Sequence, residues 1–284
     1  MPLLPVHDTH LYVDLRGPED ALPLLVLHGG PGLDHTMFGD HLDPLTDTYR
    51  LVLIDEREQG RSDRGTDRST WTLSQHASDL SAVAAALGVE RYAVLGHSFG
   101  AFIALQHLVD APGAAAATIV SHGVPSTRFL EHMEQALATF EPEDLREQVR
   151  LSWEREATVA NDEECRQLLI DQLPWHFADP RDPRIGAMTF TDMHFSPAIL
   201  RATSLEGDGL VIEVEDRLPS VRQPVLVLTG RSDRTCLPEA SERIADLVPS
   251  STLRVFEQSG HMSFIEEPEA YVATVRAFLD QLNL

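Results

Sequence analysis

The sequence predicts an α/β fold, in which a doubly wound, mostly parallel sheet is covered by helices on both faces and carries a helical insertion. Three observations support this prediction. Short apolar runs alternate with stretches of helical spacing, the runs are continuous rather than alternating in polarity, and one long segment has no convincing strand. Continuous apolar runs are typical of parallel strands buried on both faces. Alternation of strand and helix is typical of a doubly wound sheet.

The apolar runs are expected to form six strands, each followed by polar or glycine residues. They are Leu22–His28, Arg50–Asp55, Arg91–Gly96, Ala116–His122, Val225–Thr229 and Ser251–Phe256. Four stretches with apolar residues at helical spacing are expected to form the covering helices. They are Leu73–Leu87, Ser98–Val109, Glu239–Leu247 and Glu269–Leu282.

Residues 124–218 interrupt this alternation. They contain three helical stretches, Thr127–Thr139, Glu143–Val159 and Asp162–Leu173, joined by Pro-rich connections. We predict that residues 1–123 and 219–284 form the core and that 124–218 form a lid. In open α/β sheets ligands bind at the carboxyl edge of the strands, and the lid is expected to cover that edge.

The charge of the chain excludes several classes of function. Of the 284 residues 45 are acidic and 22 basic, all of them Arg, which gives a net charge of −23. A chain this acidic is repelled by phosphate backbones and anionic lipids, so neither a nucleic acid nor a membrane is expected as partner. The absence of Lys excludes a Schiff-base lysine and a phosphate-loop lysine. The lid holds 20 acidic residues against 9 Arg, so its negative potential favours approach of a cationic substrate.

Other signals are few. Met1–Asp8 does not resemble a secretory signal, and a cytoplasmic location is predicted. Cys165 and Cys236 lie far apart; one disulfide is possible, but two inert thiols are favoured. The 13 His residues show no metal-binding spacing, so neither a metal nor an organic cofactor is expected. The expected partner is a small molecule or a short peptide, and the oligomeric state is left open.

The motif with the clearest chemistry is Gly96-His97-Ser98-Phe99-Gly100, between a predicted strand and a predicted helix. It matches the G-x-S-x-G nucleophile turn in its required context. So tight a turn strains the backbone of the nucleophile and leaves no room for side chains two residues to either side, which Gly96 and Gly100 provide. Ser98 is therefore predicted to be a nucleophile at the carboxyl edge of the sheet.

A serine nucleophile needs a base, and the base needs a group that orients it. His261 lies between the last predicted strand and the last helix, which is the expected place for the base. Asp233 follows the strand Val225–Thr229 and is predicted to be the acid. Asp216 and Glu215 are the fallback, although neither ends a clear strand.

Two backbone N–H groups are expected to stabilise the oxyanion. Phe99, directly after the nucleophile, is predicted to supply one. The loop after the first predicted strand, His28-Gly29-Gly30-Pro31-Gly32, is predicted to supply the other through Gly30, with Gly29 as the alternative donor or a substrate contact. His28 itself is expected to pack under the loop.

Taken together, HGGPG at 28–32, the charged loop 55–62, GHSFG at 96–100 and Gly260-His261 resemble the proline iminopeptidase family of α/β-hydrolases. The resemblance covers nearly the whole chain except most of the lid. It implies an α/β-hydrolase fold and release of an N-terminal residue, often proline, through an acyl-enzyme. In the charged loop Glu58 replaces the family's usual glycine, so the loop is expected to bend differently. Arg57 and Asp63 are expected to brace it.

The resemblance also implies substrate-binding residues in the lid. Trp153-Glu154 is similar to a W-E motif whose Glu binds the substrate ammonium, and Trp153 also fits lid packing. Two departures favour an esterase or lactonase with the same triad as the alternative. A second amine-binding Glu is absent from Leu173–Phe177, and Arg234 follows the triad Asp, where a cation would oppose an ammonium. A non-enzymatic binding module is the third hypothesis.

Overall fold

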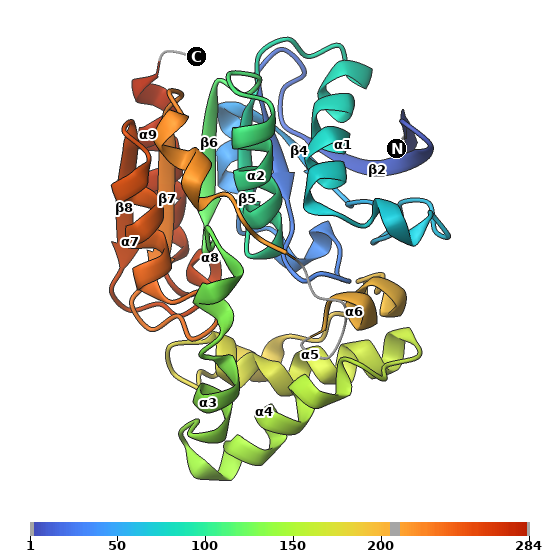
Figure 1. The fold of residues 1–284 in the computed structure, drawn as a ribbon, viewed down its shortest axis with the longest axis vertical. Coiled ribbons are helices and arrows are strands. Elements are labelled where there is room, and N and C mark those ends of the chain that lie inside the picture. Colours follow the sequence, from blue (N-terminus) through green and yellow to red (C-terminus); the bar gives the residue numbers. More distant parts are fainter. Residues whose placement is uncertain (1–2, 205–210, 283–284) are drawn as a thin grey trace.

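The computed structural model describes residues 3–204 and 211–282. Within them the strands form one eight-stranded sheet, in the order β1-β2-β4-β3-β5-β6-β7-β8 (Figure 1). The bounds are Leu3–Val6 (β1), Thr9–Arg16 (β2), Leu22–Leu27 (β3), Tyr49–Ile54 (β4), Ala93–His97 (β5), Ala117–Ser121 (β6), Val225–Gly230 (β7) and Ser251–Phe256 (β8). Strands β3 to β8 pair in parallel, which confirms the predicted fold class.

The N-terminal hairpin β1–β2 was not predicted. It pairs antiparallel with itself and with β4, at one edge of the sheet. The four residues of β1 alternate between exposed and buried, and β2 contains the polar residues His10, Asp14 and Arg16. Edge strands of this kind lack the continuous apolar run that marks a strand buried on both faces.

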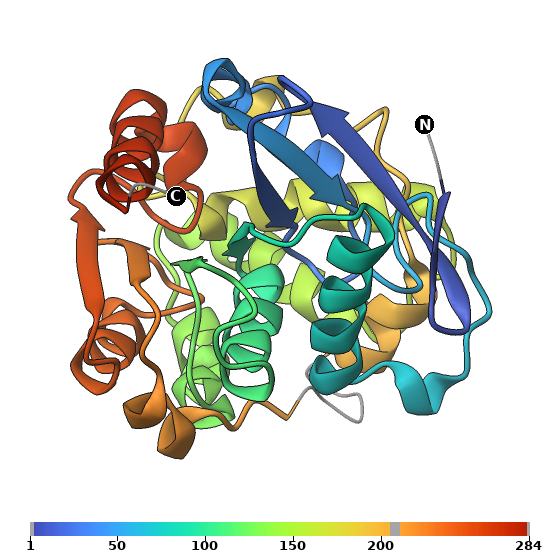
Figure 2. The ribbon, with the colours of Figure 1, turned by 90° about the horizontal axis from the view of Figure 1, so that it is seen from above.

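Helices cover both faces of the sheet (Figure 2). Alternate residues of a strand point to opposite faces. Leu25 and Leu27 of β3 pack on one side with α1 and α2, whereas Leu24 and Val26 pack on the other with α9. Helix α7 covers β7 on the α2 side. The bounds are Leu73–Ala86 (α1), Phe99–Asp110 (α2), Pro238–Leu247 (α7), Ser263–Glu266 (α8) and Pro268–Gln281 (α9).

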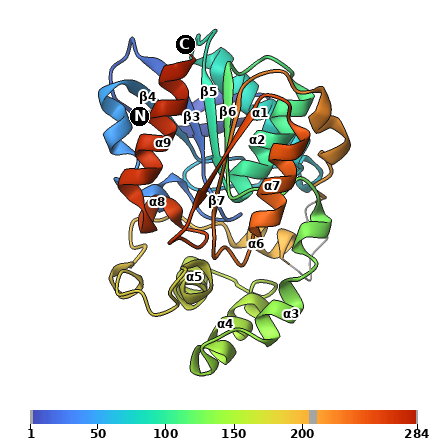
Figure 3. The same cartoon turned by 90° about the vertical axis from the view of Figure 1, so that its left-hand side faces the viewer.

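Among the described residues, four α-helices lie between β6 and β7 and gather at one end of the sheet (Figures 1 and 3). They are Met133–Ala138 (α3), Glu143–Arg155 (α4), Asp162–His176 (α5) and Pro197–Thr203 (α6). We refer to them as the lid; residues 205–210 of the predicted lid lie outside the described residues. The helical stretch predicted over Thr127–Thr139 is divided in two, because a short 3₁₀ helix at Thr127–Leu130 precedes α3. Helix α5 continues past Leu173 to His176, and α6 was not predicted.

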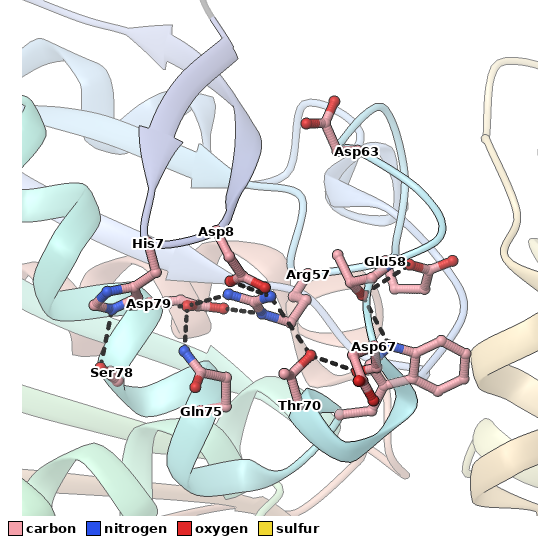
Figure 4. A network of polar contacts seen from close by, with 12 residues as sticks. His7, Asp8, Arg57, Glu58, Asp63, Asp67, Thr70, Gln75, Ser78 and Asp79 are labelled. Carbon is pink, nitrogen blue, oxygen red and sulfur yellow. Dashed lines mark hydrogen bonds and ion pairs between the residues drawn. The ribbon is translucent and has the colours of Figure 1, made fainter.

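The loop after β4 is braced by ion pairs (Figure 4). Arg57 is fully buried and donates to both carboxylate oxygens of Asp79, at 2.8 and 2.9 Å, and to Asp8 at 2.9 Å. Asp63 accepts from the backbone N–H of His10 at 3.1 Å. Both residues therefore brace the loop, as expected.

Glu58 adopts the left-handed conformation that favours glycine, with φ of 65°. Its carboxylate accepts from the backbone N–H groups of Gly65 and Thr66, both at 3.0 Å. These bonds offset part of the cost of the left-handed backbone at Glu58. The expectation that the loop bends differently from that of the family stays a prediction. Among the described residues no helix is long and apolar enough to span a membrane.

Candidate active site

Ser98 lies at the junction of β5 and α2 with φ of 54°. A Cβ atom at Gly96 would lie 2.1 Å from the carbonyl oxygen of Gly100, and one at Gly100 would lie 2.4 Å from that of Leu27. Both distances are far below van der Waals contact, so neither position tolerates a side chain. The strained turn is therefore the one predicted, at a cost of about 1–3 kcal/mol.

Asp233 and His261 meet at the carboxyl edge of the sheet. His261 Nδ1 lies 2.8 Å from Asp233 Oδ2, and the other oxygen accepts from the backbone N–H groups of Thr235 and Cys236 at 2.9 and 3.0 Å. The ring of His97, next to Ser98 in the chain, lies 5.1 Å from that of His261. The structure thus brings the three predicted triad loops together.

The fallback acids lie on the surface. The Glu215 carboxylate pairs with Arg128 at 2.9 Å and Arg243 at 2.6 Å. Asp216 is exposed in the same short helix. Neither carboxylate is available to His261, whose Nδ1 already bonds to Asp233.

A second imidazole faces Asp233. His122 Nδ1 lies 2.7 Å from Asp233 Oδ2, the oxygen that also bonds to His261. Burial alone would raise the pKa of Asp233, but the two imidazoles and their hydrogen bonds hold that pKa well below its usual range. Sequence reasoning missed His122, which was assigned to the end of a predicted strand, although it directly follows β6 at the same edge of the sheet as the loop of Asp233.

The predicted oxyanion donors lie on the two expected loops. Across the described chain, no hydrogen-bond partner is found for the backbone N–H of Phe99 or of Gly30, whereas that of Gly29 lies 2.9 Å from Met37 Sδ. The first N–H groups of a helix lack intrahelical partners, which leaves that of Phe99 available to a ligand. Gly30 is therefore the better second donor of the two alternatives.

His28 packs under this loop, as expected. It is fully buried, with Nε2 2.5 Å from the Glu56 carboxylate and Nδ1 2.7 Å from the Gly29 carbonyl oxygen. Burial alone would lower the pKa of His28. The charge of Glu56 and its hydrogen bond outweigh burial and raise that pKa to about 9. A buried ion pair thus supports the Gly29–Gly30 backbone.

The lid presents aromatic side chains to His261. His176, the last residue of α5, lies 5.2 Å from the His261 ring, and Trp153 lies 6.0 Å from His176. Trp153 Nε1 is buried and has no partner in the described part of the chain. Trp153 therefore lies on the inward face of the lid, one ring beyond His176.

Glu154 does not share that face. Its side chain is 53% exposed, pairs with Arg150 on the same helix and lines a surface depression with Leu151 and Arg155. This position speaks against the predicted contact with substrate, because the helix turns Glu154 about 100° away from Trp153.

Glu156 faces inward instead. It is 7% exposed and accepts from Gln172 Nε2 at 2.7 Å. Burial raises the pKa of Glu156 to about 7, and the bond from Gln172 only partly opposes this effect. Gln172 lies one helical turn, about 6 Å, before His176 in α5. The sequence did contain a signal for this position. Glu156 lies seven residues after Val149 and three after Trp153, and both spacings place it on the same face of the helix.

Arg234 fastens the lid and does not face a substrate site as a free cation. Its guanidinium donates to the carbonyl oxygens of Trp175, Phe177 and Ala178 at 3.2, 2.6 and 3.1 Å. These carbonyls lie at the C-terminal end of α5, where a cation is stabilising. The guanidinium is therefore directed into the lid, and the expected opposition to a substrate ammonium stays a prediction.

Further contacts tie the lid to catalytic loops. The backbone N–H of His261 donates to the carbonyl oxygen of His176 at 2.7 Å. That of Ser196, next to α6, donates to the Gly32 carbonyl oxygen at 2.8 Å. The lid therefore supports both the predicted base and the predicted oxyanion loop.

Two groups of described residues bring three potential metal-binding side chains together, His122-Asp233-His261 and Asp34-His35-Asp55. In each group an imidazole nitrogen already lies within hydrogen-bond distance of a carboxylate, such as His35 Nδ1 at 2.5 Å from Asp55. Hydrogen bonding accounts for both groups. The two cysteines are buried and free, as favoured.

Comparison with known proteins supports the assignment of the fold. The model of the alpha/beta hydrolase fold family matches residues 23–268. The chain belongs to this family. An alpha/beta hydrolase named proline iminopeptidase, from Xanthomonas citri, is 30% identical over 312 residues, 96% of this chain and 94% of the relative. Another, from Heyndrickxia coagulans, is 27% identical over 268 residues, 92% of this chain and 91% of the relative.

Solved alpha/beta hydrolases agree. A proline iminopeptidase from Mycobacterium smegmatis is 26% identical, with a TM-score of 0.77 over 98% of this chain and 97% of that one. An esterase from Rhodococcus is 23% identical with the same TM-score, over 98% of each chain, and shows the fold alone. The predicted resemblance to proline iminopeptidases is confirmed, and the protein is a hydrolase of the alpha/beta fold.

Proposed function

We propose that this protein is a serine hydrolase in which Ser98, His261 and Asp233 form the catalytic triad. The observation that carries the proposal is the bond from His261 to Asp233, beside the strained turn at Ser98. In this arrangement His261 Nε2 takes the proton of Ser98 as Oγ attacks the substrate carbonyl, and then gives it to the leaving group. Asp233 holds the ring and stabilises the imidazolium. Water releases the acyl group by the same steps in reverse.

The backbone N–H groups of Phe99 and Gly30 are proposed to stabilise the oxyanion. Donors fixed in advance are worth about 10²–10³ in rate each, because they need no reorganisation as charge develops. The Gly30 donor is held by the ion pair below its loop and by the lid contact of Gly32, so it is preorganised from both sides.

For the substrate we propose a short peptide with a free N-terminal amine, with proline as the favoured first residue. The relatives named proline iminopeptidase support this proposal. Within the lid we propose that Glu156, rather than Glu154, anchors the amine. A buried carboxylate with a single neutral donor lacks a counter-charge, and a substrate ammonium supplies one.

Hydrolysis of small esters or lactones with the same triad is the second candidate. One observation favours it. The lid residues near His261 are aromatic, namely His176 and Trp153, and the segment Leu173–Phe177 contains no carboxylate that could bind an amine.

A substrate pair separates the two candidates. The protein is assayed with a proline arylamide carrying a free amine, with its N-acetylated counterpart and with a short acyl ester. We expect kcat/KM to fall at least tenfold when the amine is blocked, because the blocked substrate forms no ion pair with Glu156. Equal rates with the blocked and free amines, together with faster hydrolysis of the ester, would reject the aminopeptidase and favour the esterase.

A further inference from the structure

The carboxylate of Asp233 is shared by two histidines. His122 and His261 both place Nδ1 within 2.8 Å of the same oxygen, Oδ2, while Oδ1 accepts two backbone N–H groups. An ionised carboxylate only accepts hydrogen bonds, so both Nδ1 atoms carry a proton. Asp233 thus receives four hydrogen bonds, of which only one serves the base.

The tautomer of His122 is fixed from its other side. His122 Nε2 lies 2.7 Å from Ser263 Oγ at the start of α8. With the proton on Nδ1, Nε2 is an acceptor, and the Ser263 hydroxyl donates to it. His122 is fully buried and has φ of 57°, a conformation that bulky residues rarely adopt. This strained backbone aims the ring at the carboxylate.

We propose that His122 is a positioning residue, which holds the carboxylate of Asp233 through Nδ1 and thereby makes His261 a weaker base. The inference rests on the proposed triad. Each donor to an oxygen withdraws electron density from it, so a shared Oδ2 stabilises the imidazolium of His261 less than an unshared one would. The consequence is activity that persists to lower pH than a triad with an unshared acid would allow.

Other titratable groups surround His261. The imidazoles of His97 and His176 lie within 5.2 Å ring to ring, and the carboxylate of Glu266 accepts from the neighbouring backbone N–H of Gly260. The charge of Arg234 is directed at lid carbonyls. Of the imidazoles in this set, only His122 shares the acceptor of His261 in the described structure. A change at His122 alone therefore reports on the shared oxygen.

The test follows the pH dependence of the rate at which a fluorophosphonate labels Ser98. Labelling needs neutral His261 but no particular substrate. His122→Phe keeps a flat ring and removes the donor, whereas His122→Asn keeps an N–H near the position of Nδ1 and tolerates positive φ. His107→Phe removes another buried histidine, which lies near the C-terminal end of α2 and bonds to Ser81 of α1, and serves as the matched control.

We expect the acid limb of the labelling profile to move up by about half a unit to one unit in His122→Phe, which lowers the rate at acidic pH about threefold to tenfold. His122→Asn should stay close to the unmodified protein, as should His107→Phe. Superimposable profiles for His122→Phe and the unmodified protein would overturn the proposal. An equal shift in His122→Asn would also overturn it, because the ring rather than the donor would then be responsible.

A measurement on the unmodified protein keeps the proposal testable if His122→Phe does not fold. In residue-assigned NMR spectra of protein with ¹⁵N-labelled histidine, the Nδ1–H groups of both His122 and His261 should resonate downfield at a pH where His261 is neutral. Assignment is needed because other buried imidazole–carboxylate pairs, such as His35 with Asp55, give downfield resonances too. A downfield Nδ1–H resonance from His261 without one from His122 would contradict the shared carboxylate. If Ser98 is not labelled at any pH, the proposed triad fails instead, so the two failures are distinguishable.

Discussion

Replacing Glu156 by Gln tests the proposed amine anchor directly. Gln keeps the size of the side chain and removes its charge. Glu156 as a whole is 7% exposed, so solvent screens an ion pair with a substrate amine only weakly. A hydrogen bond to a charged group contributes about 1.5–3 kcal/mol. At about 1.4 kcal/mol per factor of ten, Glu156→Gln should lower kcat/KM for a proline arylamide about 10- to 150-fold at pH 8.

The pH dependence of activity is an independent test of the proposed ion pair between Glu156 and the substrate amine. Glu156 binds an ammonium only when ionised, and its pKa is about 7. Activity on the amine substrate should therefore rise with pH through about 7, and this limb should disappear in Glu156→Gln. Glu154→Gln is the matched control, since Glu154 is half-exposed and paired with Arg150. A loss of activity in Glu154→Gln with none in Glu156→Gln would refute the reasoning and restore the residue favoured by the sequence.

Stability gives a second readout of the same carboxyl. The unfolded chain has a Glu pKa of about 4.3, so between about pH 4.3 and 7 the folded state binds more protons than the unfolded state. Stability from this group therefore falls as pH rises through that window, by about 4 kcal/mol at most. Denaturant titrations at pH 5 and pH 8 should show Glu156→Gln gaining stability at pH 8 relative to the unmodified protein. An equal difference at both pH values would contradict burial of the charge.

Three further substitutions have defined outcomes. Ser98→Ala should abolish turnover and fluorophosphonate labelling with an unchanged circular dichroism spectrum; full activity would remove Ser98 from the mechanism. Gly100→Ala should yield little folded protein in a solubility assay, because the added Cβ meets the Leu27 carbonyl oxygen at 2.4 Å, and a stable variant would contradict the turn geometry. Arg234→Met should lower the free energy of unfolding by about 1–3 kcal/mol through the lost lid hydrogen bonds, without weakening the preference for a free amine. A stronger preference in that variant would return Arg234 to the substrate site.

The sequence was sufficient for the parts of the site that depend on local geometry. Ser98 could be placed because a strand, two glycines and a helix fix one kind of turn. Asp233 and His261 could be placed because parallel strands end at a common edge, so the loops that follow them meet. The same reasoning identified six of the eight strands.

The remainder depends on packing between distant segments. Whether Glu154 or Glu156 faces inward depends on how α4 rotates against α5, and a helical repeat alone locates such a face only approximately. His122 was assigned to the end of a strand, and its bond to Asp233 spans 111 positions in sequence. Arg234 appeared to be a free cation because its three acceptors are backbone carbonyls, which carry no sequence signal.

The fastening of the lid has a consequence for engineering. Its anchor points fall on the loops that hold the predicted acid, the predicted base and the predicted oxyanion donor, through Arg234, His176 and Ser196 respectively. A chimera that exchanges the lid for that of a relative therefore changes the substrate pocket. It also keeps or loses the hydrogen bonds by which the lid supports the loops of the predicted site. Grafts that take residue 234 and the end of α5 from the same protein should give an active hydrolase. Grafts that take them from different proteins should give a folded core in which the loops of the predicted site are poorly ordered.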